Sequence, residues 1–573
     1  EFYTPSNLVS KMIEHSYNLG FKVLDPACGS GNFLIEIILK ILDSELTIEQ
    51  KVECINNVYG FDINPLAVLT AKVNLLLIYM DYFDVGEHLL PILNFYIVDG
   101  LFPEDYENQR YIRLNSLYNS FDLIIGNPPW LTYKDLPNGN YQERIKQLAS
   151  ELGIKPSSQY ITHIEIAAIF FYAVPTTFLK KGGNIFFVIT KSILNGDHCY
   201  KFRKFSIFTK LQIWDFPTNY FFNINHICLM AEYTGYNDIP IEENYPINAR
   251  VYNDDLSNFK NTHYSSLKIE KEGTKLILPE NKLKIINKVS ISEYRDKFYQ
   301  GATLVPRSLV FFQVQEKNKN TLIISSDEDV ITRTKKRWKY TFDEIELEKN
   351  FRFKTFLNRD LIPFLLKDTR NIFLPINKEK FDFELSHLKK FPLAYKFYKD
   401  MNAYYQQKKK KTSKIDTLFK NLNYWNKLLK QKNNDGYLVI YNASGSNLKA
   451  AVINNFKKKI IVGSENYYFN TNSKQEAYYL VGVLNSPLLT KNIKLIKSSR
   501  HIHKRPFSFP IPSFNGANEL HIAISAQGQK SESIVRDLYL KNPKINSDKV
   551  RLIINRKLNL LNQYVEEVVF TNT

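Results

Sequence analysis

Residues 23–42 read VLDPACGSGNFLIEIILKIL, an apolar strand that runs through a glycine-rich turn into an amphipathic helical pattern. A strand, glycine turn and helix in this order are typical of an α/β sheet with a nucleotide-like ligand. Gly29 and Gly31 let the backbone approach a ligand closely, and Asp25 can accept hydrogen bonds from a cationic or hydroxyl-bearing group. A dinucleotide fingerprint would need a glycine in place of Leu34 and an acid about 20 residues after the strand. Neither is present, so the pattern favours a nucleoside cofactor.

Two further predicted strands also end in a carboxylate. VYGFDINPLAV, at 58–68, carries Asp62, and NFYIVDGLF, at 94–102, carries Asp99. In a doubly wound sheet the carboxyl ends of such strands converge on one rim, where Asp62 can hold ribose hydroxyls and Asp99 an adenine amino group. Either aspartate alone is better explained as a turn residue or helix cap. Three strand-end carboxylates in succession predict a cofactor site.

The fourth predicted strand, FDLIIGNPPW at 121–130, ends in a segment suited to an exocyclic amine. The lone pair of such an amine is delocalised into its ring, so a catalyst must localise it with acceptors aimed at the amine hydrogens. Asn127 offers a side-chain carbonyl oxygen, and Pro128 offers a backbone carbonyl that the rigid ring of Pro129 helps to fix. Trp130 offers a face on which a planar base can stack. A plain strand-ending turn is the alternative for this tetrapeptide.

The ordered set FYTP, DPACGSG, GFDINP, VDG and NPPW resembles the gamma-class N6-adenine DNA methyltransferases of restriction-modification systems, which include TaqI-like and fused type IIG enzymes. The resemblance covers residues 1–235 motif by motif. It implies catalysis by Asn127, Pro128, Pro129 and Trp130. It also implies that S-adenosylmethionine is bound by Thr4, Pro5, Asp25, Gly29, Gly31, Asp62, Ile63 and Asp99.

Two later segments extend the resemblance. KKGGNIFFVITKSIL, at 180–194, resembles the family's fifth-strand motif, and FPTNYFFNINHICLMAEY, at 216–233, resembles the element whose aromatic residue packs against an extruded base. Phe222 is the first choice for that residue and Phe221 the second, with burial in the core as the alternative for both. Where the family often has an Asp-Leu-Tyr stretch, this chain has ITHIEIAAIFF at 161–171, so that part of the cofactor pocket is left open.

The charge of the chain is divided unevenly along its length. Residues 1–240 contain 18 Lys and Arg against 25 Asp and Glu, a net charge of −7, and residues 241–573 contain 58 against 33, a net charge of +25. The basic part is suited to a polyphosphate backbone. The candidate DNA-binding residues lie in RTKKRWKY at 333–340 and KSSRHIHKRPF at 497–507; they are Arg337, Lys339, Arg500, Lys504 and Arg505. The lysine run in QQKKKKTSK, at 406–414, is equally well explained as a solvated loop.

These patterns predict an α/β fold with a Rossmann-like S-adenosylmethionine-dependent methyltransferase sheet, followed by a mixed α+β target-recognition domain. We expect a catalytic domain over 1–240, a polar connector over 241–264, the target-recognition domain over 265–513 and a helical tail over 514–573. The expected strands, in a mostly parallel sheet, lie at 22–26, 58–63, 94–99, 121–127, 184–190, 210–216 and 226–233.

The four cysteines form no CxxC pair and the histidines form no HExxH motif, so the sequence predicts no metal site and a reducing, cytoplasmic environment. His501 and His503 alternate as strand residues would and are expected at the surface near DNA. No apolar run is long enough for an uninterrupted membrane span. Because the chain begins at Glu1, we expect a longer protein, with an upstream nuclease domain or a restriction or specificity partner as alternatives.

The function predicted from the sequence is methyl transfer from S-adenosylmethionine to the N6 amino group of an adenine flipped out of duplex DNA. Four alternatives stay open. RNA adenines, protein glutamines or the N4 amine of cytosine are substrates of related loops, although the long basic region disfavours glutamine. The chain can also be an inactive specificity subunit that keeps the fold.

Overall fold

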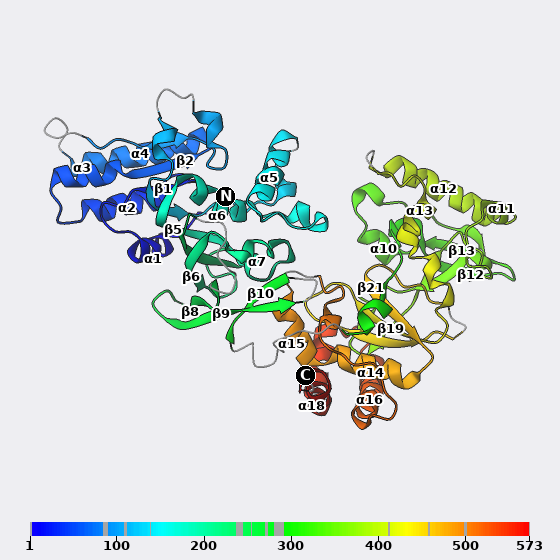
Figure 1. The fold of residues 1–573 in the computed structure, drawn as a ribbon. Helices are drawn as coiled ribbons and strands as arrows, with labels where there is room; N and C mark the ends of the chain where they lie inside the picture. The colour runs from blue at the N-terminus through cyan, green and yellow to red at the C-terminus, as the bar shows by residue number, and fades with distance from the viewer. Residues whose placement is uncertain are drawn as a thin grey trace. The chain divides into compact units, whose positions relative to one another are not determined.

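The chain folds as two compact units, residues 1–283 and 284–573, in the computed structural model shown in Figure 1. Each unit has its own sheets and its own hydrophobic core. The structure describes residues 3–83, 90–107, 112–137, 139–235, 244–253, 255–269, 273–279, 292–410, 413–456, 459–497 and 501–571.

A ten-stranded sheet organises the first unit, in the order β10-β9-β8-β6-β7-β5-β4-β1-β2-β3. Strands β3, β2, β1, β4 and β5 are parallel, β7 is antiparallel to both β5 and β6, and β8 to β10 add one parallel and two antiparallel pairings. The strands are β1 Val23–Asp25, β2 Val58–Asp62, β3 Phe95–Ile97, β4 Phe121–Gly126, β5 Leu179–Thr190, β6 Phe208–Asp215, β7 His226–Tyr233, β8 Ile247–Tyr252, β9 Phe259–Ile269 and β10 Gly273–Ile277.

Helices cover both faces of this sheet because successive strand residues point to opposite sides. Val23 of β1 packs into one core cluster with the helices α1, α2 and α4, whereas Leu24 packs into the other cluster with α5 and α6. In β4, Leu123 and Ile124 divide between the two clusters in the same way. The helices are α1 Ser6–Ser16, α2 Asn32–Leu42, α3 Ile48–Asn56, α4 Pro65–Tyr82, α5 Asn140–Glu151, α6 Ile166–Phe178 and α7 Ser192–Asn195.

The predicted strands of the first unit are all present, and the predicted α/β fold class is confirmed. The connector expected over 241–264 is wrong as a structural assignment. Strand β8 and the first part of β9 lie in this range and extend the sheet beyond β6. The polar side chains that suggested a linker belong to strands near the open edge of a sheet, where one face can meet water.

Helix α4 is the one helix, among the residues that the structure describes, that is long and apolar enough to cross a membrane by length and composition. Its inner face consists of Val68, Ala71, Leu75 and Tyr79, which are buried in the core cluster shared with α1 and α2. It packs against β2 and β3, which is the position of a covering helix in an α/β layer.

The second unit is a mixed α+β structure, as predicted. It contains a four-stranded sheet in the order β11-β21-β19-β20, a five-stranded sheet in the order β14-β13-β12-β18-β15, and the pair β16-β17. The strands are β11 Tyr299–Gln300, β12 Phe311–Lys317, β13 Thr321–Ser326, β14 Ile345–Glu348, β15 Arg352–Thr355, β16 Leu361–Ile362, β17 Leu365–Leu366, β18 Arg370–Phe373, β19 Tyr437–Asn442, β20 Ala450–Asn454 and β21 Asn466–Thr471. The helices are α9 Tyr294–Lys297, α10 Glu328–Thr332, α11 Leu385–Leu388, α12 Pro392–Lys408, α13 Leu418–Leu422, α14 Lys474–Asn485, α15 Pro487–Ile496, α16 Glu519–Lys541, α17 Ser547–Asn555 and α18 Asn559–Glu566.

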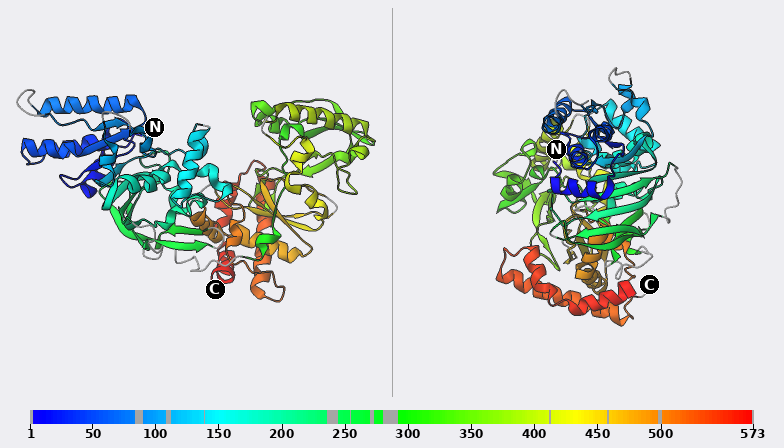
Figure 2. Two further views of the ribbon diagram at one scale, coloured as in Figure 1. Left: turned by 45° about the horizontal axis from the view of Figure 1, so that its top comes forward. Right: turned by 90° about the vertical axis from the view of Figure 1, so that its left-hand side faces the viewer.

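The C-terminal helices are part of this unit and do not form a separate tail. Figure 2 shows α16 and the helices after it packed beside the helices that precede them, and α16 contacts α14 along its length. The approach is close at Gly528, where a Cβ would lie 2.4 Å from the carbonyl oxygen of Tyr478. The hydroxyl of Ser525 donates to the carbonyl of Gln475 at 2.8 Å. The boundary expected at 513 therefore does not divide two structural units.

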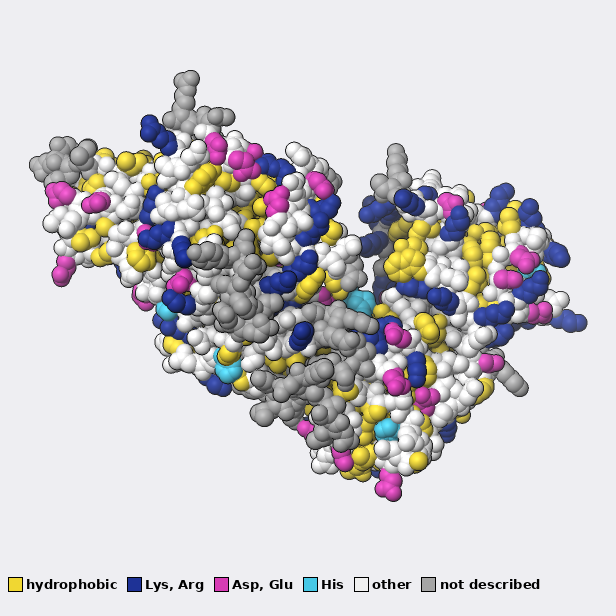
Figure 3. All heavy atoms as spheres, in the orientation of Figure 1, with side chains coloured by type: hydrophobic (Ala, Val, Ile, Leu, Met, Phe, Trp, Pro, Cys, Tyr) yellow, Lys and Arg dark blue, Asp and Glu magenta, His cyan; other side chains and the backbone are white. Residues whose placement is uncertain are grey.

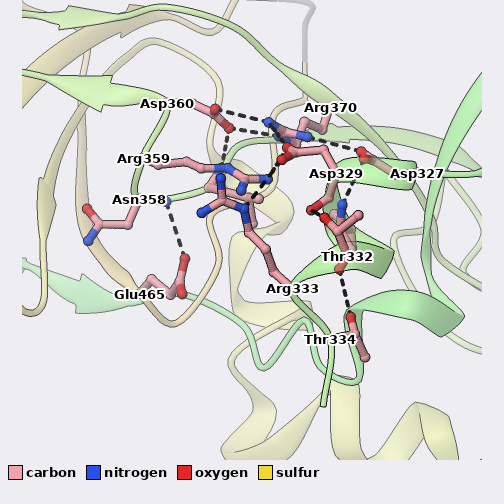
Figure 4. A network of polar contacts seen from close by, with 12 residues as sticks. Asp327, Asp329, Thr332, Arg333, Thr334, Asn358, Arg359, Asp360, Arg370 and Glu465 are labelled. Carbon is pink, nitrogen blue, oxygen red and sulfur yellow. Dashed lines mark hydrogen bonds and ion pairs between the residues drawn. The ribbon is translucent and has the colours of Figure 1, made fainter. Parts of the chain in front are cut away.

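A network of ion pairs centred on Arg370 joins β18 to α10 in the second unit (Figure 4). The Arg370 guanidinium lies 3.1 Å from Asp327, 3.0 Å from Asp329 and 2.9 Å from Asp360. The Asp327 and Asp360 side chains are only 5% and 8% exposed, so they depend on this cation for compensation. Arg333 reaches the same network from its edge, 3.5 Å from Asp329, and is 70% exposed.

We expect Arg370→Met to lower the free energy of unfolding by about 3 kcal/mol, because it leaves buried carboxylates without their cation. The matched control is Arg333→Met, which should cost less than about 1 kcal/mol because its ion pair is exposed. Urea denaturation of both variants measures the difference. Equal losses in the two variants would contradict a buried, cation-dependent network.

Candidate active site

The candidate site lies where the direction of the strand order reverses. Strand β1 has β2 on one side and β4 on the other, with Leu24 paired to Tyr59 and to Ile124. At such a point the loops leaving the carboxyl ends of adjacent strands diverge, and ligands of open α/β sheets bind in the crevice between them. The predicted residues Asp25, Asp62 and Asn127 all lie at these strand ends.

The glycine turn after β1 adopts the backbone that its sequence predicts. Gly29 and Gly31 have φ values of 56° and 92°, in the left-handed region that favours glycine. The amide of Gly29 donates to the Asp62 carboxylate at 2.9 Å, and the amide of Cys28 donates to the carbonyl of Phe61 at 2.8 Å. Among the residues that the structure describes, no atom beyond the chain neighbours lies within 4 Å of the position that a Cβ of Gly29 would occupy. The turn is thus tied to β2 and open beside Gly29.

Asp25 is buried at the end of β1, directly beside the end of β4. Asp25 is only 2% exposed, and its carboxyl group accepts a hydrogen bond from the backbone amide of Ala27 at 3.1 Å. A Cβ on Gly126 would lie 2.5 Å from Asp25 Oδ1, so only glycine allows β4 to pass this carboxylate. Burial raises the pKa of Asp25 to about 8, and the charge of Asp62 adds to the increase while the Ala27 hydrogen bond opposes it.

The segment at 127–130 shares this rim with the glycine turn. The side-chain nitrogen of Asn127 donates to the hydroxyl of Thr4 at 3.0 Å. The side chain of Asn32, at the start of α2, donates to the backbone carbonyl of Thr4 at 3.2 Å. Thr4, which is 4% exposed, therefore connects the β4 loop to the helix that follows the glycine turn. Three segments separated by up to 123 residues in sequence meet at one place.

Two further predicted cofactor residues, Ile63 and Asp99, follow the ends of β2 and β3. Asp99 is 7% exposed and accepts hydrogen bonds from the amide of Leu101 at 2.9 Å and from the hydroxyl of Tyr141 at 3.0 Å. Burial raises the pKa of Asp99, although both hydrogen bonds oppose the increase. Ile63 is 64% exposed, so it presents an apolar surface to solvent next to Asp62.

Trp130 and Phe222, both predicted to contact a base, lie next to each other. Their ring centroids are 4.9 Å apart in an edge-to-face arrangement, and the indole N–H of Trp130 donates to the carbonyl of Val188 at 3.2 Å. Phe222 is only 6% exposed and belongs to the same core cluster as Phe216. His226, which the sequence did not single out, stacks on Trp130 at 6.0 Å, and burial lowers its pKa.

A buried polar cluster that no motif suggested lies beside this loop. Glu165 accepts hydrogen bonds from Thr190, Ser192 and His198, and the Cys199 thiol lies 3.9 Å from one of its oxygens. Burial would lower the pKa of His198, but its contacts with Cys199 and Glu165 raise it to about 10. Glutamate, histidine and cysteine atoms within 4.8 Å of one another are types that can ligate a metal. The hydrogen bonds already made by the carboxylate favour a structural role.

The backbone around Glu165 holds the segment that follows β4, at 127–132, in place. The amide of Ile166 donates to the carbonyl of Leu131 at 2.9 Å, and Glu165 forms a β-bridge with Thr132. Glu165 lies in the stretch where the chain departs from the family pattern, and His198 is 33 residues further on. No sequence spacing indicates this contact, because the two residues meet only when β5 and α6 pack together.

The predicted DNA-binding residues differ in accessibility within the second unit. Arg337 and Lys339 are exposed, and the Lys504 side chain is 31% exposed with its ammonium 3.9 Å from Asp296. Arg505 is only 8% exposed, so most of its surface is unavailable to a phosphate. Arg500 lies outside the residues that the structure describes.

Comparison with known families gives a match for part of the first unit. Residues 56–222, from β2 to Phe222, match the family model described as Eco57I restriction-modification methylase. This stretch of the chain is similar to restriction-modification methylases. A curated relative, the type I restriction enzyme MjaIX methylase subunit of Methanocaldococcus jannaschii, is 25% identical over 130 residues, which are 23% of this chain and 19% of the relative. The match spans about a fifth of that relative's length.

Solved structures share the fold of the first and second units. The type IIL restriction-modification enzyme MmeI, solved in complex with DNA, covers 99% of this chain and 72% of its own at 13% identity, with a TM-score of 0.54. A DrdV–DNA complex covers 93% of this chain and 57% of its own at 13% identity, with a TM-score of 0.52. A nuclease-deletion mutant of the type ISP enzyme LlaGI, with a DNA substrate mimic, covers 93% and 47% at 11% identity, with a TM-score of 0.53.

We expect Asp25→Asn to stabilise the methylase domain increasingly as pH rises from about 4 to about 8. A free aspartate loses its proton near pH ~4, whereas the folded protein holds the Asp25 proton up to a pKa of about 8. The folded state therefore binds more protons in this window, and wild-type stability falls as pH rises through it. Melting temperatures of both proteins across the window test this, with exposed Asp81→Asn controlling for the loss of one carboxylate. Parallel curves for wild type and Asp25→Asn would contradict it.

Proposed function

We propose that the chain transfers a methyl group from S-adenosylmethionine to the N6 amino group of an adenine flipped out of duplex DNA, within a restriction-modification system. One observation carries the proposal. The glycine turn after β1 and the Asn127-Pro128-Pro129-Trp130 segment after β4 share one rim, with Gly126 against Asp25 and Asn127 bonded to Thr4. A donor held by the turn would be adjacent to a base held by the segment, which is the proximity that group transfer requires.

The residues of this rim fit a nucleoside sulfonium. The open space beside Gly29 admits a ligand to the backbone, and the buried Asp25 carboxylate, whose pKa is raised by its burial, would gain from a cationic or hydroxyl-bearing partner. The exposed Ile63 offers an apolar surface to a planar ring. We assign the cofactor to Thr4, Pro5, Asp25, Gly29, Gly31, Asp62, Ile63 and Asp99. When bound, it would supply a methyl group on positively charged sulfur.

The protein's own part in the chemistry is positioning. The carbonyl oxygens of Asn127 and Pro128 would accept the two amine hydrogens and so localise the nitrogen lone pair, while Pro129 restricts the backbone between them and Trp130. The nitrogen becomes positively charged as the new bond forms and releases its proton afterwards, so a strong general base is not required. Trp130 would stack on the base, and Phe222 would close the pocket from behind it.

The second unit supplies the charge needed to hold duplex DNA. Residues 284–573 contain 52 Lys and Arg against 26 Asp and Glu, a net charge of +26. Dark-blue basic side chains are spread across the face of this unit seen in Figure 3. We propose that Arg337, Lys339 and Lys504 contact phosphates, which gives salt-dependent affinity without sequence information. Extruding the base would cost about a few kcal/mol of unstacking free energy, which stacking on Trp130 and the other contacts of the flipped base would offset.

The cellular setting is inferred from the same observations. The four cysteines at 28, 54, 199 and 228 are free thiols, which accords with a reducing cytoplasm. We propose that a nuclease or specificity component, in the same protein or a separate subunit, completes the system; the curated relative is itself named as a methylase subunit of a restriction enzyme.

We expect Asn127→Ala to reduce methyl transfer by at least about 100-fold, because it removes one of two acceptors for the amine. Binding of S-adenosylmethionine, measured by calorimetric titration, should be largely retained. Asn18→Ala, the same chemical change at an exposed position away from the rim, is the control and should leave both unchanged. Full activity of Asn127→Ala would remove Asn127 from the catalytic role.

Tritiated methyl transfer to DNA and to RNA, followed by separation of the modified nucleosides, distinguishes the substrates. We expect N6-methyladenine in DNA. Label in RNA, or N4-methylcytosine in DNA, would replace the adenine assignment with one of the alternatives. A chain that binds DNA but gives no signal in a titration with S-adenosylmethionine would be a specificity subunit.

A further inference from the structure

Trp425 is an exposed aromatic side chain on a short projection of the second unit. Leu422 and Leu428, three residues to either side, are fully buried, so the chain is anchored before and after the projection. Between them lies the single turn η11 (Tyr424–Asn426), in which Trp425 is 71% exposed and Tyr424 is 39% exposed. A single exposed apolar residue is ordinary in proteins. Backbone conformation, ring geometry and charge distinguish this one.

The backbone holds the Trp425 ring outward in a conformation that bulky residues rarely adopt. Trp425 and Asn426 have φ values of 55° and 58°, in the left-handed region. Such strain persists only where neighbouring groups fix it. The Asn423 side chain fixes it. Its oxygen accepts hydrogen bonds from the backbone amides of Leu428 at 3.2 Å and Leu429 at 3.1 Å, and its nitrogen donates to the side-chain oxygen of Asn426 at 3.2 Å.

The ring is also supported from below. Tyr424 stacks on Trp425 with ring centroids 4.9 Å apart and planes 21° from parallel. The Lys427 ammonium lies 4.9 Å from the Trp425 ring centroid and donates to the side-chain carbonyl of Gln300 at 2.8 Å. Trp425 nevertheless stays 71% exposed, so the arrangement presents a preorganised aromatic surface with a cation over part of the ring.

The sequence around Trp425 is rich in lysine and poor in acidic residues. Residues 408–432 contain nine lysines and one acid, Asp416, which is already paired with Lys420 at 2.8 Å. Lys430 and Lys432 are exposed. A partner for this surface must combine negative charge with flat apolar rings, and nucleic acid does so.

Packing brings a second basic stretch to the same lobe. Trp338, within the basic residues 333–340, stacks on Tyr405 of α12 at 5.8 Å, and the hydroxyl of Tyr404 donates to the carbonyl of Lys339 at 2.9 Å. Helix α12 in turn packs against α13, which precedes the Trp425 turn. Basic segments far apart in sequence are thus joined through one helix.

We propose that Trp425 stacks on a base exposed at an opened step of the DNA that this unit grips, while the lysines around it neutralise nearby phosphates. The inference rests on the proposed function and adds a base-contacting residue to it. Stacking on an aromatic face is tolerant of sequence, because every base has such a face. The contact therefore contributes affinity and leaves sequence readout to other side chains.

The test uses the full chain and a fluorescently labelled duplex of mixed sequence, with affinity measured by anisotropy at several salt concentrations. Trp425→Ala should weaken binding by about 5- to 100-fold and leave the salt dependence unchanged, because no charge is removed. Trp425→Phe should retain most of the affinity. Lys430→Ala with Lys432→Ala should instead reduce the slope of log affinity against log salt by about two. Leu540→Ala, at an apolar position that is 70% exposed on α16, is the control and should bind as wild type does.

Fluorescence gives an independent readout, because Trp425 is one of four tryptophans. DNA should quench the emission of the wild type, and the quenching should be largely lost in Trp425→Phe. Wild-type affinity in Trp425→Ala, or unchanged quenching in Trp425→Phe, would overturn the stacking role while leaving the methyltransferase proposal standing. Failure of the wild-type chain to bind the duplex would instead overturn both.

Discussion

The parallel pairing of β1 with β4 is the constraint on which the candidate site depends. It places the carboxylate that ends β1 directly beside the chain that leaves β4, and it does so at a distance that tolerates no side chain at Gly126. The glycine turn, the N-terminal Thr4 and the polar loop at 127–130 all take their positions from this pairing. A shift of register by one residue would send Asp25 and its neighbours to the opposite faces of the sheet, and the rim would lose its chemistry.

The two units treat buried charge in opposite ways. Asp25 is buried with one backbone hydrogen bond and an anionic neighbour, so its pKa rises toward neutrality and a cationic ligand would relieve it. Asp327 and Asp360 are similarly buried, but Arg370 compensates both through its planar guanidinium. A buried carboxylate that is paired with a cation needs no further partner, whereas a buried carboxyl with a raised pKa at a strand end is typical of functional sites.

Aromatic contacts set the accessible surface of the second unit. Stacking of Trp338 on Tyr405 and of Phe383 on Phe419, at 5.8 Å and 4.1 Å, fixes loops that would otherwise be held only by polar residues. The lysine-rich stretches at 333–340 and 408–432 are thereby anchored to the core, and their like charges, which repel one another, stay at the surface. The same packing leaves Trp425 outward, in contrast to Trp338, because Leu422 and Leu428 take the core positions on either side of it.

The sequence by itself determined strands β1 to β7 of the first unit and the glycines and carboxylates at their ends. Strand periodicity, glycines and strand-end carboxylates are local signals, and each is encoded within a few consecutive residues. Only the tertiary structure decided that β8 and β9 extend the sheet through the expected connector and that the C-terminal helices pack on α14. It alone joined Glu165 to His198, buried Arg505 and exposed Trp425. These outcomes depend on contacts between residues distant in sequence, whose energies are decided by packing and desolvation and leave no periodic mark on the chain.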